Sequence, residues 1–163
     1  MARTSKRKVR LESQSLQENV SVKTYMAGIY ARLSVDNHDG KEISIETQIE
    51  MAKEYLKSHT EITLYDCYSD LGATGTNFQR SDFERLMQDV RDGLINCIIV
   101  KDFSRFGRNY IETGNFVEKI FPFLGVRFIA ITDQYDSIKQ ADCNEALSMH
   151  LKNIANELYA RDI

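Results

Sequence analysis

Short apolar runs alternate with amphipathic segments over most of the chain. Four runs are short, largely apolar and bounded by polar or glycine-containing stretches, which predicts β-strands over 27–31, 62–68, 97–100 and 126–132. Between them, apolar residues recur at helical spacing, which predicts helices over about 44–58, 81–92 and 109–121, and a last one from about 144 onward. Strands that alternate with amphipathic helices predict an α/β fold, a three-layer sandwich with a central and mostly parallel sheet.

Individual residues indicate where these helices begin and end. Ser81 followed by Glu84 is a capping-box pattern, so we expect it to start the second helix, and Gly93 is a natural stop. Asn109 favours the start of a third helix. Pro122 is expected to disturb that helix near its end, because proline lacks a backbone N–H and its ring clashes with the preceding turn.

The chain divides into three segments. Residues 1–23 are polar and without periodicity, so we expect a flexible basic arm, either a solubilising extension or a weak attractor of phosphates. Residues 24–140 contain the predicted strands and the first three helices. The helical pattern over 141–163 has no stop signal before Ile163, so we expect the start of a long helix that continues in a longer parent protein.

Composition and charge narrow the classes of function. The 163 residues, 42% hydrophobic and 28% charged, suit one globular core. No apolar run approaches the roughly 18 residues of a membrane span, and no signal-peptide pattern opens the chain, so we expect a cytoplasmic protein without a membrane partner. The net charge of −3 argues against nucleic acid, but the first 20 residues carry five basic and two acidic residues, so the remainder holds −6.

The cysteines and histidines give no pattern of metal ligands. The three cysteines lack a CxxC spacing and the three histidines are scattered, so neither a metal nor another cofactor is predicted. Cys67 and Cys97 lie in apolar runs, which is typical of reduced cysteines that pack in a core.

Candidate chemistry gathers at the carboxyl ends of the predicted strands, where open α/β sheets have their ligand crevices. Alternate side chains of a strand share a face, so Tyr30, Arg32 and Ser34 would project together from the end of the first strand. A serine in such a place is by itself more often a turn former than a nucleophile. Its neighbours therefore decide its role.

Three further segments contribute to this edge. The run 101–109 follows the third strand and brings Arg105 and Arg108 to the threshold of a helix N-terminus, which favours anions. The loop 70–80 contains glycines that allow the backbone to approach a phosphate closely. Gln48, in the first helix, is either an ordinary surface residue or a polar group near the crevice.

Several arginines beside a hydroxyl indicate chemistry on a phosphate. The guanidinium fork matches the non-bridging oxygens and stays charged at any working pH. Phosphoryl transfer depends mostly on positioning and electrostatics, which such arginines supply. A Ser–His–Asp hydrolase fits less well, because the sequence has no GxSxG motif and no histidine stands out as a base. A nucleotide-binding P-loop is absent too, because no GxxxxGK[ST] motif occurs.

Five motifs occur in the order and spacing of a known family: Y-A-R-L-S (30–34), S-I-E-T-Q (44–48), Y-S-D-L-G-A-T-G-T-N-F-Q-R (68–80), V-K-D-F-S-R-F-G-R-N (100–109) and N-E-L-Y-A-R-D-I (156–163). Through them the chain resembles the resolvase/invertase family of serine recombinases over about residues 25–163. It is more closely similar to the large serine recombinases of phage integrases and mobile transposons. The resemblance implies a resolvase-like catalytic domain over 24–140.

The resemblance implies an enzyme that cleaves and rejoins double-stranded DNA at specific sites, for excision or integration of a mobile element. Ser34 would attack a phosphodiester and form a 5′-phosphoserine link, which conserves the bond energy without ATP, metal or cofactor. The residues implied to hold the scissile phosphate are Arg32, Arg80, Arg105 and Arg108. The implied supporting residues are Tyr30, Gln48, Asp70 and Lys101. Arg161 would lie on a long helix that serves contacts in a homo-oligomer, a dimer or the active tetramer, and reaches towards DNA.

Two points stay open. No side chain is an obvious proton acceptor for Ser34, and Ser104 stands where the smaller resolvases have an aspartate. Two other classes of function share the same residues: a non-catalytic, flavodoxin-like regulatory or binding module in which Ser34 is inert, and a phosphate-ester hydrolase. An interaction module has no need for arginines that meet at one sheet edge, so their placement discriminates between these classes.

Overall fold

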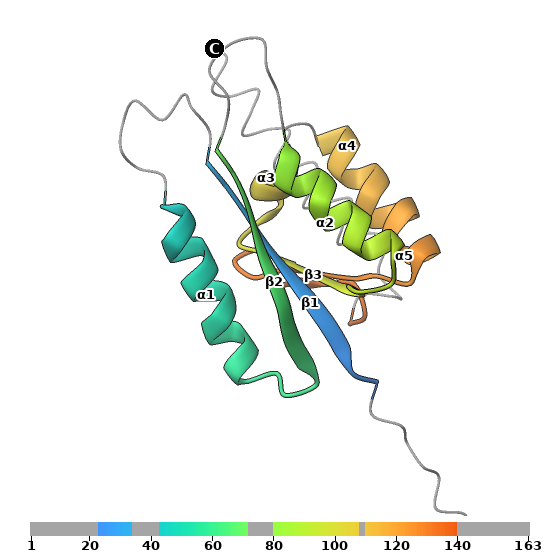
Figure 1. The fold of residues 1–163 in the computed structure, drawn as a ribbon, viewed down its shortest axis with the longest axis horizontal. Helices are drawn as coiled ribbons and strands as arrows, with labels where there is room; N and C mark the ends of the chain where they lie inside the picture. Colours follow the sequence, from blue (N-terminus) through green and yellow to red (C-terminus); the bar gives the residue numbers. More distant parts are fainter. Residues whose placement is uncertain (1–22, 34–42, 72–79, 108–109, 140–163) are drawn as a thin grey trace, which may run out of the picture.

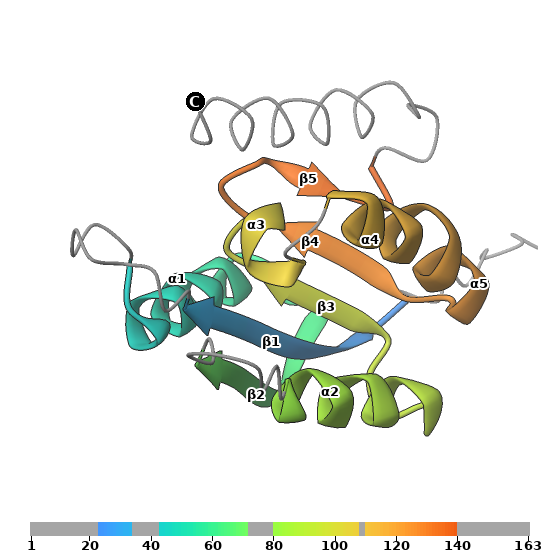
Figure 2. The same ribbon diagram turned by 90° about the horizontal axis from the view of Figure 1, so that it is seen from above.

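The strands form a single sheet between two layers of helices (Figures 1 and 2). The structure, a computed structural model, describes residues 23–33, 43–71, 80–107 and 110–139. The strand order is β2-β1-β3-β4-β5, with the bounds β1 (Tyr25–Leu33), β2 (Ile62–Leu71), β3 (Cys97–Val100), β4 (Arg127–Ala130) and β5 (Tyr135–Asp136). The pairs among β1 to β4 are parallel and β5 is antiparallel to β4. The predicted α/β sandwich with a mostly parallel sheet is confirmed.

Each face of the sheet has its own core. Helix α1 (Ile45–Lys57) covers one face, where Ala52 packs with Ile29 and Ile99. Figure 1 shows the other helices on the opposite side: α2 (Ser81–Arg91), α3 (Phe103–Phe106), α4 (Tyr110–Asn115), the π-helical turn η1 (Phe116–Ile120) and α5 (Phe121–Leu124). The core beneath them is strongly aromatic, with Phe106 and Phe128 in edge-to-face contact at its centre. This arrangement leaves the carboxyl ends of the parallel strands between the two helix layers.

Strand β1 lies in the middle of the parallel part of the sheet, between β2 and β3. It pairs with β2 as far as Leu33, but with β3 only over Ala27–Tyr30, because β3 ends at Val100. Beyond that point α3 replaces β3 as the neighbour of β1. At Gly28 the strand passes close under α2, where an added Cβ would lie only 2.7 Å from Leu86 Cδ1. The absence of a side chain at this position therefore lets α2 approach the sheet.

The start of α2 differs from the capping box that the sequence predicts. Arg80 is the N-cap residue and makes no capping bond through its side chain, and Ser81 is already helical. The cap comes instead from Asp70 at the end of β2, whose carboxylate accepts hydrogen bonds from the backbone N–H groups of Asp82 (3.1 Å) and Phe83 (3.0 Å). A carboxylate near the first turn also suits the positive end of the helix dipole. The capping-box prediction was therefore wrong, since a residue distant in sequence supplies the acceptor.

The predicted end of the second helix is confirmed, whereas Asn109, the predicted start of the third, lies outside the described residues. Helix α2 ends at Arg91 and Gly93 follows with a φ of 75°, a left-handed conformation that glycine adopts without strain. Pro122 lies in the first turn of α5, directly after the π-helical turn η1, so the chain stays helical through η1 to Leu124 and does not end at the proline. The sequence analysis did not identify α3 or β5. Most of the predicted arm and the whole of the predicted helix over 141–163 lie outside the described residues.

Candidate functional site

Gln48 holds the end of β1. Its side chain is buried, and its amide accepts a hydrogen bond from the Arg32 backbone N–H (3.3 Å) and donates one to the Arg32 carbonyl (3.1 Å). It also donates to the carbonyl of Ile43, just before α1 (2.9 Å). The amide therefore supplies one donor and one acceptor to β1, as the peptide of a neighbouring strand would. Of the two interpretations of Gln48, the structure supports the polar group near the crevice.

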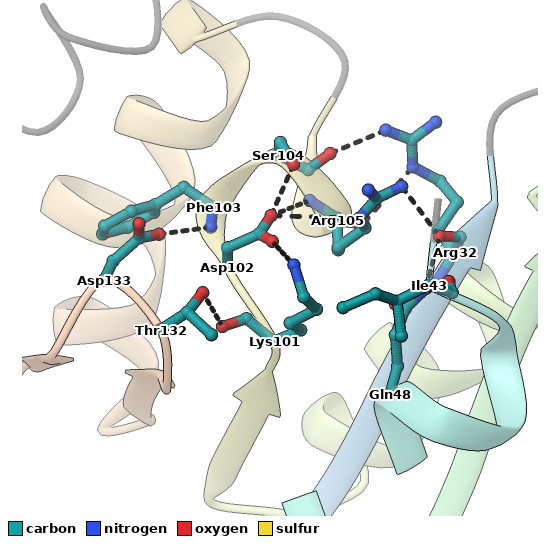
Figure 3. Close-up of polar contacts among 10 residues, drawn as sticks. All are labelled: Arg32, Ile43, Gln48, Lys101, Asp102, Phe103, Ser104, Arg105, Thr132 and Asp133. Atoms are coloured by element: carbon teal, nitrogen blue, oxygen red, sulfur yellow. Dashed lines mark hydrogen bonds and ion pairs between the residues drawn. The ribbon is translucent and has the colours of Figure 1, made fainter. Parts of the chain in front are cut away.

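Arg32 extends from this strand end onto α3 (Figure 3). Its side chain is buried, and its guanidinium group donates to the carbonyl of Ser104 (2.7 Å) and to that of Arg105 (3.3 Å). Arg105 returns the contact, because its Nη1 donates to the carbonyl of Arg32 (3.4 Å). The two arginines therefore cross, each bonded to the other's backbone, and fix the end of β1 against α3.

Arg80 reaches the same short helix from the start of α2. Its Nη2 donates to the carbonyl of Phe106, and its Nε and Nη2 lie 3.4 and 3.2 Å from the hydroxyl oxygen of Tyr30. The guanidinium carbon lies 3.9 Å from the centre of the Phe83 ring, a cation–π contact. Glu112, at the start of α4, lies 3.6 Å from Arg80 Nη1. Arg80 is therefore held by an aromatic wall, a carbonyl and a carboxylate.

Three consecutive carbonyls of α3 gather these arginines. Those of Ser104 and Arg105 accept from Arg32, and that of Phe106 accepts from Arg80. The last carbonyls of a helix have no partner within the helix, so they are free to accept bonds from outside. We call this set, Ser104 O, Arg105 O and Phe106 O, the carbonyl cradle. The structure thus brings Arg32, Arg80 and Arg105 to one edge of the sheet.

Tyr30 and Asp70 join the cradle to α2. The Tyr30 hydroxyl donates to the Asp70 carboxylate (2.9 Å), which is the same carboxylate that caps α2. Burial raises the pKa of Tyr30 to about 12, against the opposing charge of Arg80 and with a further contribution from Asp70. The hydroxyl is therefore protonated at neutral pH and acts as a hydrogen-bond donor to Asp70 rather than as a proton acceptor.

Lys101 lies at the end of β3 and pairs with Asp102, at 2.7 Å between Nζ and Oδ2. Asp102 is also the N-cap residue of α3. Burial alone would raise the pKa of Asp102, but hydrogen bonds from Lys101 and Ser104 and the charges of Lys101 and Arg105 lower it below its ordinary value. Sequence analysis did not identify Asp102 or Glu112, although an aspartate directly before a short helical turn is the usual N-cap signal.

Three of the predicted site residues, Ser34, Arg108 and Arg161, lie outside the described residues. Within the described ranges, no set of three or more histidine, cysteine, aspartate or glutamate side chains is arranged to hold a metal ion. Among the helices that the structure describes, none is long and apolar enough to cross a membrane.

Comparison with known proteins identifies relatives of this fold. The family model described as the resolvase N-terminal domain matches residues 27–163. The catalytic domain of TP901-1 integrase is 22% identical with a TM-score of 0.60, over 84% of this chain and 97% of that chain. A resolvase-family site-specific recombinase from Streptococcus pneumoniae is 24% identical with a TM-score of 0.63, over 85% of this chain and 93% of that chain. No curated protein sequence matches the chain.

A third structure agrees with these two. The catalytic domain of ISC1926 TnpA, an IS607-like serine recombinase, is 17% identical with a TM-score of 0.51, over 82% of this chain and 98% of that chain. At such identities the solved structures establish a shared fold, whereas the family model spans all but the first 26 residues of the chain. The chain therefore belongs to the resolvase family and carries the N-terminal domain of that family over residues 27–163.

Proposed function

We propose that this domain cleaves and rejoins DNA, with Ser34 as the nucleophile. The observation that carries the proposal is the carbonyl cradle, because it gathers Arg32 and Arg80 beside Arg105 at the carboxyl end of β1. Ser34 follows Leu33, the last residue of that strand. A nucleophile in this place would have three guanidinium groups near it, and membership of the resolvase family supports DNA as the substrate.

The proposed reaction exchanges one phosphate ester for another. The Ser34 hydroxyl loses its proton as its oxygen attacks the phosphorus of a DNA backbone phosphate. The bond from phosphorus to the 3′-oxygen breaks, and that oxygen leaves with a proton as a 3′-hydroxyl. The product is a 5′-phosphoserine ester, which a 3′-hydroxyl of another strand end attacks to rejoin the DNA. Because an ester bond is kept throughout, the exchange needs no ATP.

The arginines would stabilise the negative charge that develops on the non-bridging oxygens. Arg32 and Arg105 fix each other through backbone carbonyls, so their side chains are ordered before DNA binds. Such preorganisation removes the cost of arranging flexible cations in the transition state. Arg108 would contribute a fourth guanidinium group. Double-stranded DNA at a specific recombination site and further copies of the same chain are the proposed partners.

The experiment that tests this proposal is the capture of a covalent protein–DNA adduct. The full-length protein is mixed with supercoiled plasmids that carry fragments of its host's genomic DNA, and the reaction is stopped with detergent. DNA joined to protein is recovered and digested, and the mass of the Ser34 peptide is measured. We expect a nucleotide remnant on Ser34. Ser34→Ala should bind the same DNA without forming an adduct, whereas Ser58→Ala, at an exposed serine after α1, should form it normally.

The arginines are tested in the same assay. Arg105→Ala should lower the rate of adduct formation by roughly 10²-fold or more, as for other losses of a transition-state charge partner. Arg91→Ala, at an exposed arginine near the opposite end of α2, is the matched control. An adduct from Ser34→Ala, a remnant on another residue, or hydrolysis of a small phosphate ester by a wild-type protein that never captures DNA would overturn the proposal.

A further inference from the structure

The carboxylate of Asp102 lies between the side chains of Lys101 and Arg105 (Figure 3). Oδ2 accepts a hydrogen bond from Lys101 Nζ at 2.7 Å. Oδ1 accepts from the hydroxyl of Ser104 and from the backbone N–H of Arg105, the latter at 3.2 Å, and lies 4.0 Å from Arg105 Nε. The Asp102 side chain is 14% exposed. One mostly buried carboxylate therefore lies within ion-pair distance of the Lys101 and Arg105 side chains.

Asp102 also acts on Arg32 through α3. As the N-cap residue it fixes the start of this one-turn helix, and the Ser104 and Arg105 carbonyls of the same turn hold the Arg32 guanidinium group. The backbone N–H of Phe103 has a separate acceptor, the carboxylate of Asp133 at 2.8 Å. The start of α3 is therefore held from two strand ends, so the capping role of Asp102 is partly shared. Its contact with Lys101 and Arg105 is a distinct role that depends on its charge.

We propose that Asp102 is a positioning residue for the phosphate-binding cations: it aligns Lys101 and Arg105 directly and Arg32 through α3. The inference rests on the proposed function, because it assigns these cations to a scissile phosphate. Lysine and arginine side chains each lose rotamer entropy when they are ordered. A carboxylate between them offsets this cost and their mutual repulsion before DNA binds. The carboxylate itself stays ionised, because its neighbours hold its pKa below the ordinary range.

Asp102→Asn separates charge from shape. Asparagine caps a helix about as well as aspartate does, so α3 should persist. We expect a folded protein with a melting temperature within a few degrees of wild type and unchanged DNA binding. The rate of adduct formation at saturating DNA should fall about 10-fold or more. Asp92→Asn makes the same chemical change at an exposed aspartate that ends α2, and should leave the rate unchanged.

A double-mutant cycle distinguishes positioning from a general structural role. If Asp102 acts through Lys101, adding Asp102→Asn to Lys101→Met should lower the rate further by much less than it does in the wild-type background. The thermal stabilities should be close to additive. Additive losses of rate would overturn the proposal, and so would a wild-type rate in Asp102→Asn or a loss of rate that merely follows a loss of DNA binding.

The alignment can also be measured without DNA. The Nε–H signals of Arg32 and Arg105 in a nitrogen-15 spectrum should be narrow and slow to exchange with water in the wild type, and broad or fast to exchange in Asp102→Asn. Unchanged signals overturn the positioning role even if no adduct is ever found. A wild-type protein that forms no adduct counts against the proposed function alone, so the two failures are distinguishable.

Discussion

Replacing Asp70 with alanine removes the group that caps α2 from outside the helix. The buried carboxylate accepts hydrogen bonds from the backbone N–H groups of Asp82 and Phe83 and from the hydroxyl of Tyr30. Loss of an N-cap costs about 0.5–2 kcal/mol. A buried hydroxyl left without its acceptor adds about 1–3 kcal/mol. We therefore expect Asp70→Ala to lower the free energy of unfolding by about 1.5–5 kcal/mol, from a total of about 5–15 kcal/mol for a typical domain.

Urea denaturation measures this loss. For a slope of about 2 kcal/mol per molar urea, the midpoint should fall by about 0.8–2.5 M while the slope stays constant. Ser81→Ala is the matched control, because the sequence pattern assigns the cap to Ser81 and the structure assigns it to Asp70. This control should change the stability by no more than about 0.5 kcal/mol. A cost for Ser81→Ala as large as that for Asp70→Ala would refute the reasoning.

Three further predictions concern packing and charge. Gly28→Ala places a methyl group against Leu86 Cδ1 and should lower stability by about 1–3 kcal/mol, seen as a lower melting temperature. Arg127→Ala removes the guanidinium group that donates two hydrogen bonds to the buried carboxylate of Asp136. The free energy of unfolding measured in urea should fall by about 3–5 kcal/mol. The folded-state pKa of Asp102 lies below its ordinary value, so its stabilising effect is complete above pH of about 4 and is lost as the pH falls further. The difference in stability between wild type and Asp102→Asn should therefore be constant near neutral pH and shrink in acid.

For each of these three substitutions, one outcome would contradict the prediction. A Gly28→Ala protein as stable as wild type would mean that Leu86 moves aside without loss. A cost below about 1 kcal/mol for Arg127→Ala would mean that water reaches Asp136. A stability difference for Asp102→Asn that grows on acidification would reverse the direction of the assigned pKa shift.

The sequence predicted the sheet edge well because periodicity and order along the chain determine it. Apolar runs separated by amphipathic helices require parallel strands, and parallel strands place their carboxyl ends together. Arg32 lies near the end of β1, and Arg105 lies shortly after the end of β3. Their contact could therefore be expected from the sequence. The roles of the individual residues came from the resemblance to a family rather than from the pattern.

Contacts between a side chain and a distant backbone could not be predicted in this way. The bonds from Asp70 to the start of α2 join groups more than ten residues apart, and no local motif encodes them. The carbonyl cradle depends on α3, which is a single helical turn and too short to produce a periodic signal. Asp102 was overlooked for the same reason, since its role as a cap is visible only once that turn is known.

The amide of Gln48, which bonds both backbone groups of Arg32, also affects how β1 opens over time. The part of β1 over Ala27–Tyr30 is bonded to strands on both sides, so its amides exchange with solvent only when the sheet itself separates. The Arg32 amide is released by rotation of one glutamine side chain. Protection against hydrogen exchange should therefore drop within two residues along a single strand. The strand that leads to Ser34 is thus held by its neighbouring strands over Ala27–Tyr30. At Arg32 it is held by the Gln48 side chain of α1, so the opening of this end depends on that one side chain.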